Sequence, residues 1–246
     1  ELAAKAAPDG YTIILGTSGS VIVTPSLFTK LRYDPVKDFT PITHLTSMPF
    51  VLVVNPALPA RSLKELIALA KTKPGQLSYA SPSSLFYLVG EMFKVRTGAD
   101  IAYIPYKGSA PSFTALISGE VAMTLDGILT VIPHVKAGKA SAIAICSAKR
   151  SPGMPEVPTM LESGFSDFEA NSFASLLAPA KTPEEIVKKL NAEIVRIMHM
   201  QAVRDRLLGM GVDIVGSTPA EFSAHIKAEL EKYAKVIKAA GIPKIE

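Results

Sequence analysis

Apolar residues recur along the chain in two alternating patterns, short β-branched runs and longer segments that carry one apolar face. Phe50–Val54 is a short apolar run of the kind that forms a buried strand, whereas Leu66, Ile67 and Ala70 have helical spacing. Runs with strand character lie at 11–16, 42–45, 50–54, 77–80, 101–104, 121–125, 142–148 and 172–177, and helical segments lie at 63–72, 85–97, 111–118, 183–199 and 219–237. This alternation predicts an α/β fold with a mostly parallel sheet covered by helices on both faces.

Four helix starts carry capping signals. Ser62 and Thr159 are each followed three residues later by Glu, the spacing of a capping box. Thr182 and Thr218 are each followed by Pro, which suits the first position of a helix. We therefore expect a helix to begin after each of the four residues.

The amino-acid composition limits the classes of protein and of binding site that this chain can form. The chain has 246 residues, of which 48% are hydrophobic and 20% charged, so it can bury one large core or two modest ones. Its single cysteine, Cys146, excludes an internal disulfide and any site built from several cysteines. The net charge of +4 comes without a basic cluster, which favours small anions over nucleic acid as partners. Glu1–Ala7 resembles the end of a helix and shows neither Met nor a signal segment, so we expect a preceding part of the protein to be absent from this sequence.

Catalytic signatures are missing from the sequence. The four histidines, at positions 44, 134, 199 and 225, form no HExxH motif and have no metal-ligand spacing. Gly16–Ser20 resembles the nucleophile elbow of hydrolases, but its fifth residue is Ser20 where the motif needs glycine. Neither a GxGxxG fingerprint nor a Walker loop occurs, and Cys146 lies within a predicted strand. We therefore expect no enzyme activity, no metal and no cofactor.

Three strand ends instead lead into short turns rich in hydroxyl groups, each before a predicted helix. They are Gly16–Ser20, Ala80–Ser84 and Tyr106–Pro111. Free amides and hydroxyls at the positive end of a helix suit a carboxylate, although ordinary helix capping is the better explanation of any one turn taken alone. Because ligands of α/β proteins bind at the carboxyl ends of strands, the three turns together favour an anion site.

Six segments, spread in order over the whole chain, resemble one family closely. The family comprises the periplasmic receptors of tripartite tricarboxylate transporters, also called Bug proteins. The segments are 6–12, 33–41, 64–71, 105–111, 155–159 together with Glu162, and 178–183.

The resemblance implies a type II periplasmic-binding-protein fold, in which two lobes joined by two crossing strands close on a ligand. Lobe one would comprise 1–47 and 173–246, and lobe two 48–172. Family members also carry a further segment ahead of Ala6 that would supply the first strands of lobe one and part of the ligand cradle.

Carried over position by position, the resemblance implies ligand contacts through amides and hydroxyls of these loops. Asp126 matches an acid that could accept a hydrogen bond from a ligand hydroxyl, amine or bridging water, or could instead cap the next turn. The implied ligand-binding residues are Thr17, Ser18, Ser20, Ser81, Ser83, Ser84, Gly108, Ser109, Asp126 and Phe173.

Two features depart from the family pattern. The second loop is shorter than is usual, and the chain has no Trp, so Phe173 stands where the hinge strand often carries one. Phe86 and Tyr87 would either add an aromatic wall to the site or belong to the core of their helix.

The resemblance predicts a monomeric, periplasmic receptor that captures a small carboxylate and delivers it to the membrane components of the transporter. The alternative is an intracellular ligand-sensing domain of similar fold, which the start of the precursor would distinguish.

Overall fold

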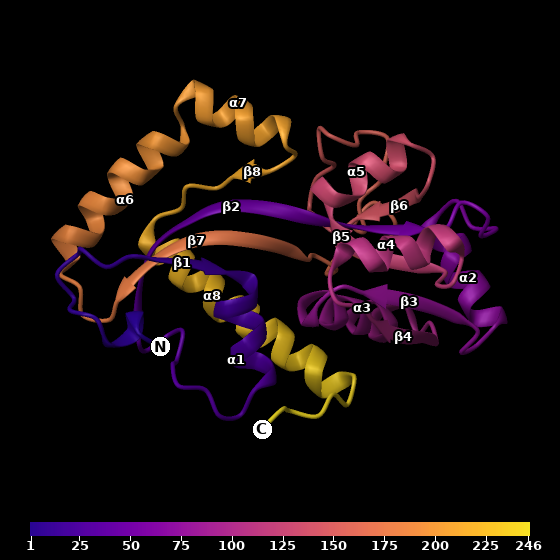
Figure 1. Ribbon diagram of the computed structural model, residues 1–246, viewed down its shortest axis with the longest axis horizontal. Helices are drawn as coiled ribbons and strands as arrows, with labels where there is room; N and C mark the ends of the chain where they lie inside the picture. Colours follow the sequence, from indigo (N-terminus) through magenta and orange to yellow (C-terminus); the bar gives the residue numbers. More distant parts are fainter. The chain divides into compact units, whose positions relative to one another are not determined.

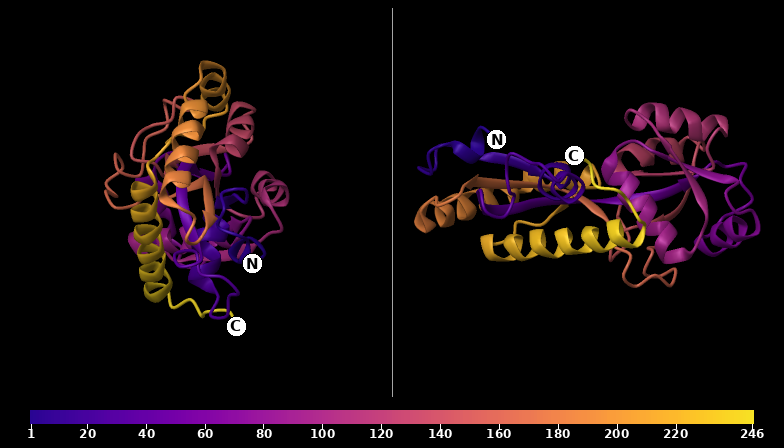
Figure 2. Two further views of the ribbon diagram at one scale, coloured as in Figure 1. Left: turned by 90° about the vertical axis from the view of Figure 1, so that its left-hand side faces the viewer. Right: turned by 90° about the horizontal axis from the view of Figure 1, so that it is seen from below.

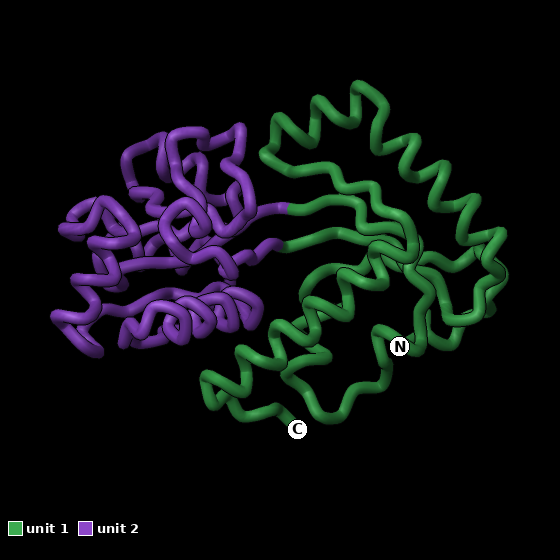
Figure 3. The backbone as a smooth tube through the Cα atoms, turned by 180° about the vertical axis from the view of Figure 1, so that it is seen from behind, with its two compact units in different colours: residues 1–47, 172–246 green, residues 48–171 purple.

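The computed structural model describes all 246 residues, which divide into two compact units. Unit 1 comprises residues 1–47 and 172–246, and unit 2 comprises residues 48–171, as coloured in Figure 3. Two strands run from one unit into the other: β2 (Phe39–Val54) and β7 (Asn171–Pro179). No helix is both long enough and apolar enough to cross a membrane.

Unit 2 contains a mixed sheet with helices on both faces. Its strands, besides the end of β2, are β3 (Leu77–Ser81), β4 (Ile101–Pro105), β5 (Met123–Gly127) and β6 (Ser141–Ile145). β3 pairs in parallel with β4 and β5, while β2 pairs antiparallel with β5 and β6. The helices are α2 (Leu63–Thr72), α3 (Ser84–Thr97), α4 (Ser109–Ser118) and α5 (Ile128–Lys136). In Figures 1 and 2, α3 lies along β3 and β4.

The core of unit 2 follows from the alternation of side chains along its strands. Val51 and Val53 belong to an apolar cluster that includes Phe113 of α4 and Val131 of α5. Phe50, which points to the opposite face, packs against Phe86 of α3 with ring centroids 4.6 Å apart. Every residue of β5 is buried, as expected for a strand covered on both faces.

Unit 1 combines antiparallel strands with longer helices. β1 (Ile14–Thr17) pairs with β7, and β8 (Asp213–Ile214) pairs with the first part of β2. The helices are a 3-10 turn (Ala3–Lys5), a π-helical turn (Gly19–Val23), α1 (Thr24–Leu27), α6 (Glu184–Met198), α7 (Gln201–Gly209) and α8 (Pro219–Ala239). α8 packs on α1 and the π-helical turn through an apolar stripe that includes Phe222, Ile226 and Tyr233.

The α/β prediction is confirmed, but the expectation of a mostly parallel sheet is wrong. Only β3 with β4 and β3 with β5 pair in parallel. β2, which runs from unit 1 into unit 2, lies antiparallel to its partners β5, β6 and β8, and β1 lies antiparallel to β7.

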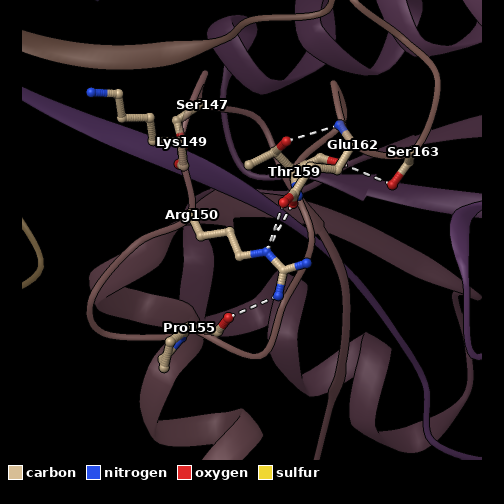
Figure 4. Close-up of polar contacts among 7 residues, drawn as sticks. All are labelled: Ser147, Lys149, Arg150, Pro155, Thr159, Glu162 and Ser163. Atoms are coloured by element: carbon tan, nitrogen blue, oxygen red, sulfur yellow. Dashed lines mark hydrogen bonds and ion pairs between the residues drawn. The ribbon is translucent and has the colours of Figure 1, made fainter.

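The region around Thr159 also differs from its prediction. Both capping-box hydrogen bonds form: Thr159 N–H donates to Glu162 Oε2 at 2.8 Å, and Glu162 N–H donates to Thr159 Oγ1 at 3.0 Å. The residues form turns and no helix follows. Figure 4 shows that Glu162 is also held by Arg150, whose Nε lies 2.8 Å from Oε2 and whose Nη1 donates to the Pro155 carbonyl. Glu162 therefore fastens a loop where the sequence predicts the start of a helix.

Candidate functional site

The carboxyl ends of β3, β4 and β5 meet at one edge of the sheet in unit 2, because these strands run in parallel. A helix begins just after each strand, at Ser84, Ser109 and Ile128. The first amides of three helices of 14, 10 and 9 residues therefore lie at this edge. Their dipoles favour a negative charge there.

The loops after β3 and β4 are fastened to each other by backbone hydrogen bonds. Gly108 N–H donates to the Pro82 carbonyl at 3.2 Å, and Tyr106 N–H donates to the Ser81 carbonyl at 2.9 Å. Gly108 has φ +102°, a backbone conformation that residues other than glycine rarely adopt. This pairing brings together the starts of α3 and α4, and with them two of the three predicted hydroxyl-rich turns.

The serines of these loops differ in what they contact. Ser81 is buried, and its Oγ donates to the Ser83 carbonyl at 2.8 Å, so this hydroxyl shapes the loop. Ser83 is the N-cap residue of α3 and its side chain makes no capping hydrogen bond, whereas Gly108, the N-cap residue of α4, has no side chain to make one. Ser83 and Ser84 are exposed, and Ser109 is half-buried. The loops thus present amides and hydroxyls that an anion can engage.

Asp126 lies at the end of β5, between the starts of α4 and α5. It is 2% exposed, its Oδ1 accepts from the Gly127 N–H at 2.7 Å, and its Oδ2 is buried without a hydrogen-bond partner. Burial raises the pKa of this carboxyl, while the nearby Ser109 hydroxyl, the Gly127 amide, the Thr130 hydroxyl and His134 oppose the rise. The alternative of a simple cap accounts for Oδ1 and leaves Oδ2 unexplained.

Thr130 was not among the predicted site residues. It lies in the first turn of α5, a helix that the sequence analysis does not predict. A strand end followed by the run Ile128–Val131 was the signal that could have revealed it.

The predicted residues of unit 1 are mostly engaged with one another. Thr17 N–H donates to Ser20 Oγ at 3.1 Å, and the two hydroxyl oxygens lie 3.3 Å apart. Ser18 is buried, and its Oγ accepts from the Phe173 N–H at 2.8 Å. The segment that follows is a π-helical turn and a four-residue helix, too short for the dipole argument to apply. The loop holds β1 to β7, and only Thr17 and Ser20 are exposed.

Phe173 is buried in a cluster of rings within unit 1. It contacts His44 and His225, with ring centroids 5.2 and 5.6 Å away, and Phe222 at 5.9 Å. Burial and then the neighbouring His225 lower the pKa of His44 to about 4, against the opposing effect of the Thr46 carbonyl. Phe173 therefore packs as a core residue in this structure.

Phe86 and Tyr87 are both half-buried on α3. Phe86 packs on Phe50, and Tyr87 contacts Tyr103 of the edge strand β4 with ring centroids 4.4 Å apart. These contacts support the core alternative for Phe86 and place Tyr87 beside β4.

The chain offers no group of side chains suited to holding a metal ion. No cluster of three or more His, Cys, Asp or Glu side chains could hold a metal ion. Burial raises the pKa of the Cys146 thiol, which keeps it protonated and unreactive.

Comparison with known proteins identifies relatives along the whole chain. The profile of the family described as "Tripartite tricarboxylate transporter family receptor" matches residues 1–242. Protein BugT of Bordetella pertussis is 36% identical over 241 residues, which cover 97% of this chain and 74% of BugT.

Two similar solved structures contain bound carboxylates. Rpa4515 of R. palustris, solved with adipate, is 35% identical with a TM-score of 0.85, and the match covers 99% of this chain and 82% of that one. MatC of Rhodopseudomonas palustris, solved with malate, is 32% identical with a TM-score of 0.79, covering 96% and 82% of the two chains. The chain belongs to the receptor family of the tripartite tricarboxylate transporters and has the α/β periplasmic-binding-protein fold of its Bug relatives.

Proposed function

We propose that this protein is a periplasmic receptor that captures a small carboxylate and delivers it to the membrane components of a tripartite tricarboxylate transporter. The family match supports the receptor role, and the relatives solved with adipate and malate support the class of ligand. The proposal assigns no chemical step to the protein, and it takes the receptor to act as a monomer without a cofactor.

The joined starts of α3 and α4 are the observation that carries the proposal. Two helices of 14 and 10 residues begin at loops that are hydrogen-bonded to each other, and neither receives a cap from its N-cap side chain. Amides at such a terminus bind anions through hydrogen bonds and through the positive end of the dipole. In this proposal Ser83, Ser84, Gly108 and Ser109 contact the ligand carboxylate, while Ser81 shapes the loop.

The unit 1 residues have a narrower role in the proposal. Thr17 and Ser20 are exposed and can contact ligand through their hydroxyls, whereas Ser18 is occupied with Phe173. Ser20→Ala therefore tests the unit 1 loop separately from the loops of unit 2.

Calorimetric titration of the full chain with mono-, di- and tricarboxylates tests the binding proposal. We expect at least one acid to bind, whereas neutral sugars and amines of matched size do not. Binding of sugars or amines in the absence of any carboxylate binder would contradict the proposal.

Delivery needs a separate measurement. We expect uptake of the bound acid, in radiolabelled form, by proteoliposomes that contain the cognate membrane components only when the receptor is added. Uptake at the same rate without the receptor would overturn the delivery role and leave the binding role standing.

A further inference from the structure

One oxygen of the Asp126 carboxylate has no hydrogen-bond partner in the structure, although the Ser109 and Thr130 hydroxyls lie near enough to interact with the carboxyl. Its Oδ2 is buried and unpartnered, whereas Oδ1 is fixed by the Gly127 amide at 2.7 Å. A buried polar atom without a hydrogen-bond partner is destabilising, more so when it is charged, so an unsatisfied oxygen at the edge of the proposed site points to a missing donor.

The surroundings of Asp126 define the kind of group that fits. Ser109, the first residue of α4, and Thr130, in the first turn of α5, are the hydroxyls close enough to affect the carboxyl. The Thr124 hydroxyl below them donates to the Ala80 carbonyl at 2.9 Å and lies 3.1 Å from Ser112 Oγ, which fixes α4 on β3 and β5. The side chains around Oδ2 are therefore polar, and the backbone that carries them is held in place.

A bare carboxylate does not suit both parts of this edge. The starts of α3 and α4 attract a negative group, whereas Asp126 next to them repels one. A ligand that carries a hydrogen-bond donor close to its carboxylate satisfies both, because the carboxylate meets the amides while the donor reaches Oδ2.

Resting on the proposed function, we propose that Asp126 makes the receptor selective for carboxylates that carry a neighbouring hydroxyl or ammonium group. The donor binds Asp126 Oδ2, and the unsubstituted acid of the same length leaves that oxygen unpaired. Asp126 thereby acts as a specificity-determining residue within the carboxylate site.

Length-matched acids that differ only at the carbon next to the carboxylate test the proposal. The three sets are succinate, malate and aspartate; glutarate, 2-hydroxyglutarate and glutamate; and adipate, 2-hydroxyadipate and 2-aminoadipate. In the set whose length fits best, we expect the hydroxy or amino acid to bind about 10-fold more tightly, or more, than the unsubstituted acid, in line with a hydrogen bond to a charged group.

Asp126→Asn is the informative variant. Because the Gly127 N–H needs an acceptor, the asparagine keeps its carbonyl oxygen there and places its NH₂ group where Oδ2 was. A donor then faces the ligand donor, and we expect the preference for the substituted acid to disappear. Asp100→Asn is the matched control: Asp100 precedes β4 at the opposite edge of the sheet and should leave the preference unchanged.

The outcomes separate this inference from the function on which it rests. Equal affinity for substituted and unsubstituted acids in the wild-type protein would overturn the role of Asp126 while leaving a carboxylate receptor in place, with a bound water as the partner of Oδ2. If none of the nine acids nor any other carboxylate binds, the proposed function itself fails. The comparison of acids on wild-type protein decides the matter even if Asp126→Asn does not fold.

Discussion

At the scale of single residues, neighbouring serines on the same loop differ in the hydrogen bonds that their hydroxyls make. Ser81 and Ser83 are two positions apart, yet only Ser81 Oγ makes a hydrogen bond that closes the loop. The sequence shows three hydroxyls in a row of four residues and does not show which of them point into the structure. The sequence therefore predicted the turn between strand and helix, the contact that each hydroxyl makes had to come from the structure, and ligand binding by this turn stays a prediction.

Ser83→Ala should weaken binding of a carboxylate and leave stability unchanged. The exposed Ser83 hydroxyl makes no capping bond in the free protein, so its loss should change the free energy of unfolding by less than about 0.5 kcal/mol. Affinity should fall by about 0.5–3 kcal/mol if the hydroxyl donates to the ligand. Calorimetry and urea unfolding measure the two effects.

Two other serines serve as comparisons for Ser83→Ala. Ser81→Ala removes a buried hydrogen bond and should lower the free energy of unfolding by about 0.5–1.5 kcal/mol. Ser118, at the far end of α4, should affect binding in no measurable way when changed to Ala. Unaltered ligand affinity in Ser83→Ala would show that the Ser83 hydroxyl does not contact the ligand.

His44 should make the protein less stable in mild acid. Its pKa is about 4 in the folded state, below the ordinary 6.5, so the unfolded chain takes up a proton first as the pH falls. The free energy of unfolding should then decrease from about pH 6.5 downward, by up to about 3 kcal/mol near pH 4. Urea unfolding of wild type and His44→Gln at several pH values measures the difference.

Two controls isolate the His44 effect from other titrating groups. The raised pKa of Asp126 acts with the opposite sign, because that carboxyl holds its proton more tightly when folded. The difference between wild type and variant cancels this contribution. His199→Gln, at an exposed position, should keep the full pH dependence, and a parallel decline in His44→Gln would contradict the assignment.

At the scale of elements, prediction succeeded where local pattern and tertiary context agree. α8 begins with the full capping box predicted at Thr218 and Glu221 and buries the predicted apolar stripe. Thr182 has the same sequence signal, but its hydroxyl donates to the Pro179 carbonyl and α6 begins without a side-chain cap. Such a hydroxyl can accept from an amide of the helix or donate to a carbonyl of the preceding turn, and the sequence does not show which hydrogen bond forms.

β2 and α5 are two elements that the sequence did not predict correctly. The sequence suggests two strands separated near Pro49, yet β2 is continuous, because proline and the residue before it accept an extended backbone. The ladder with β8 ends at Ser47, and the ladders with β5 and β6 begin at Phe50 and Val51, so Pro49 lies outside all three. α5 was not predicted. It contains an interior proline, Pro133, and packing of Ile128 and Val131 stabilises the helix.

Pro133→Ala should stabilise the protein. Pro133 lies in the interior of α5, where it lacks the N–H that would bond to the preceding turn. Alanine restores that bond, and we expect the free energy of unfolding to rise by about 1–2 kcal/mol, less than the full cost of an interior proline because the unfolded chain also gains freedom. Urea unfolding measures the gain. Pro111→Ala in the first turn of α4, where proline is tolerated, should give a much smaller change; equal effects would refute the helix-interior explanation.

At the scale of the whole molecule, the residues that carry the proposed function all belong to unit 2. The hydroxyls and amides at the starts of α3 and α4, together with Asp126, all belong to residues 48–171. The residues predicted in unit 1 serve mainly to fasten β1 to β7. Ligand binding should therefore be visible as added stability that depends on the loops of unit 2.

A bound carboxylate should raise the melting temperature of the full chain by an amount that Ser83→Ala reduces. At 100 times its dissociation constant, a ligand adds about 2.7 kcal/mol to the free energy of unfolding. For a protein of this size that corresponds to a shift of about 5–10 °C. At the same ligand concentration the weaker affinity of Ser83→Ala should leave a smaller shift, while the melting temperatures of the two ligand-free proteins should agree. Differential scanning calorimetry of both proteins, with and without ligand, makes the comparison. An equal ligand-induced shift in both would place the stabilising contacts elsewhere, and Ser20→Ala would then show whether they lie in the loop of unit 1.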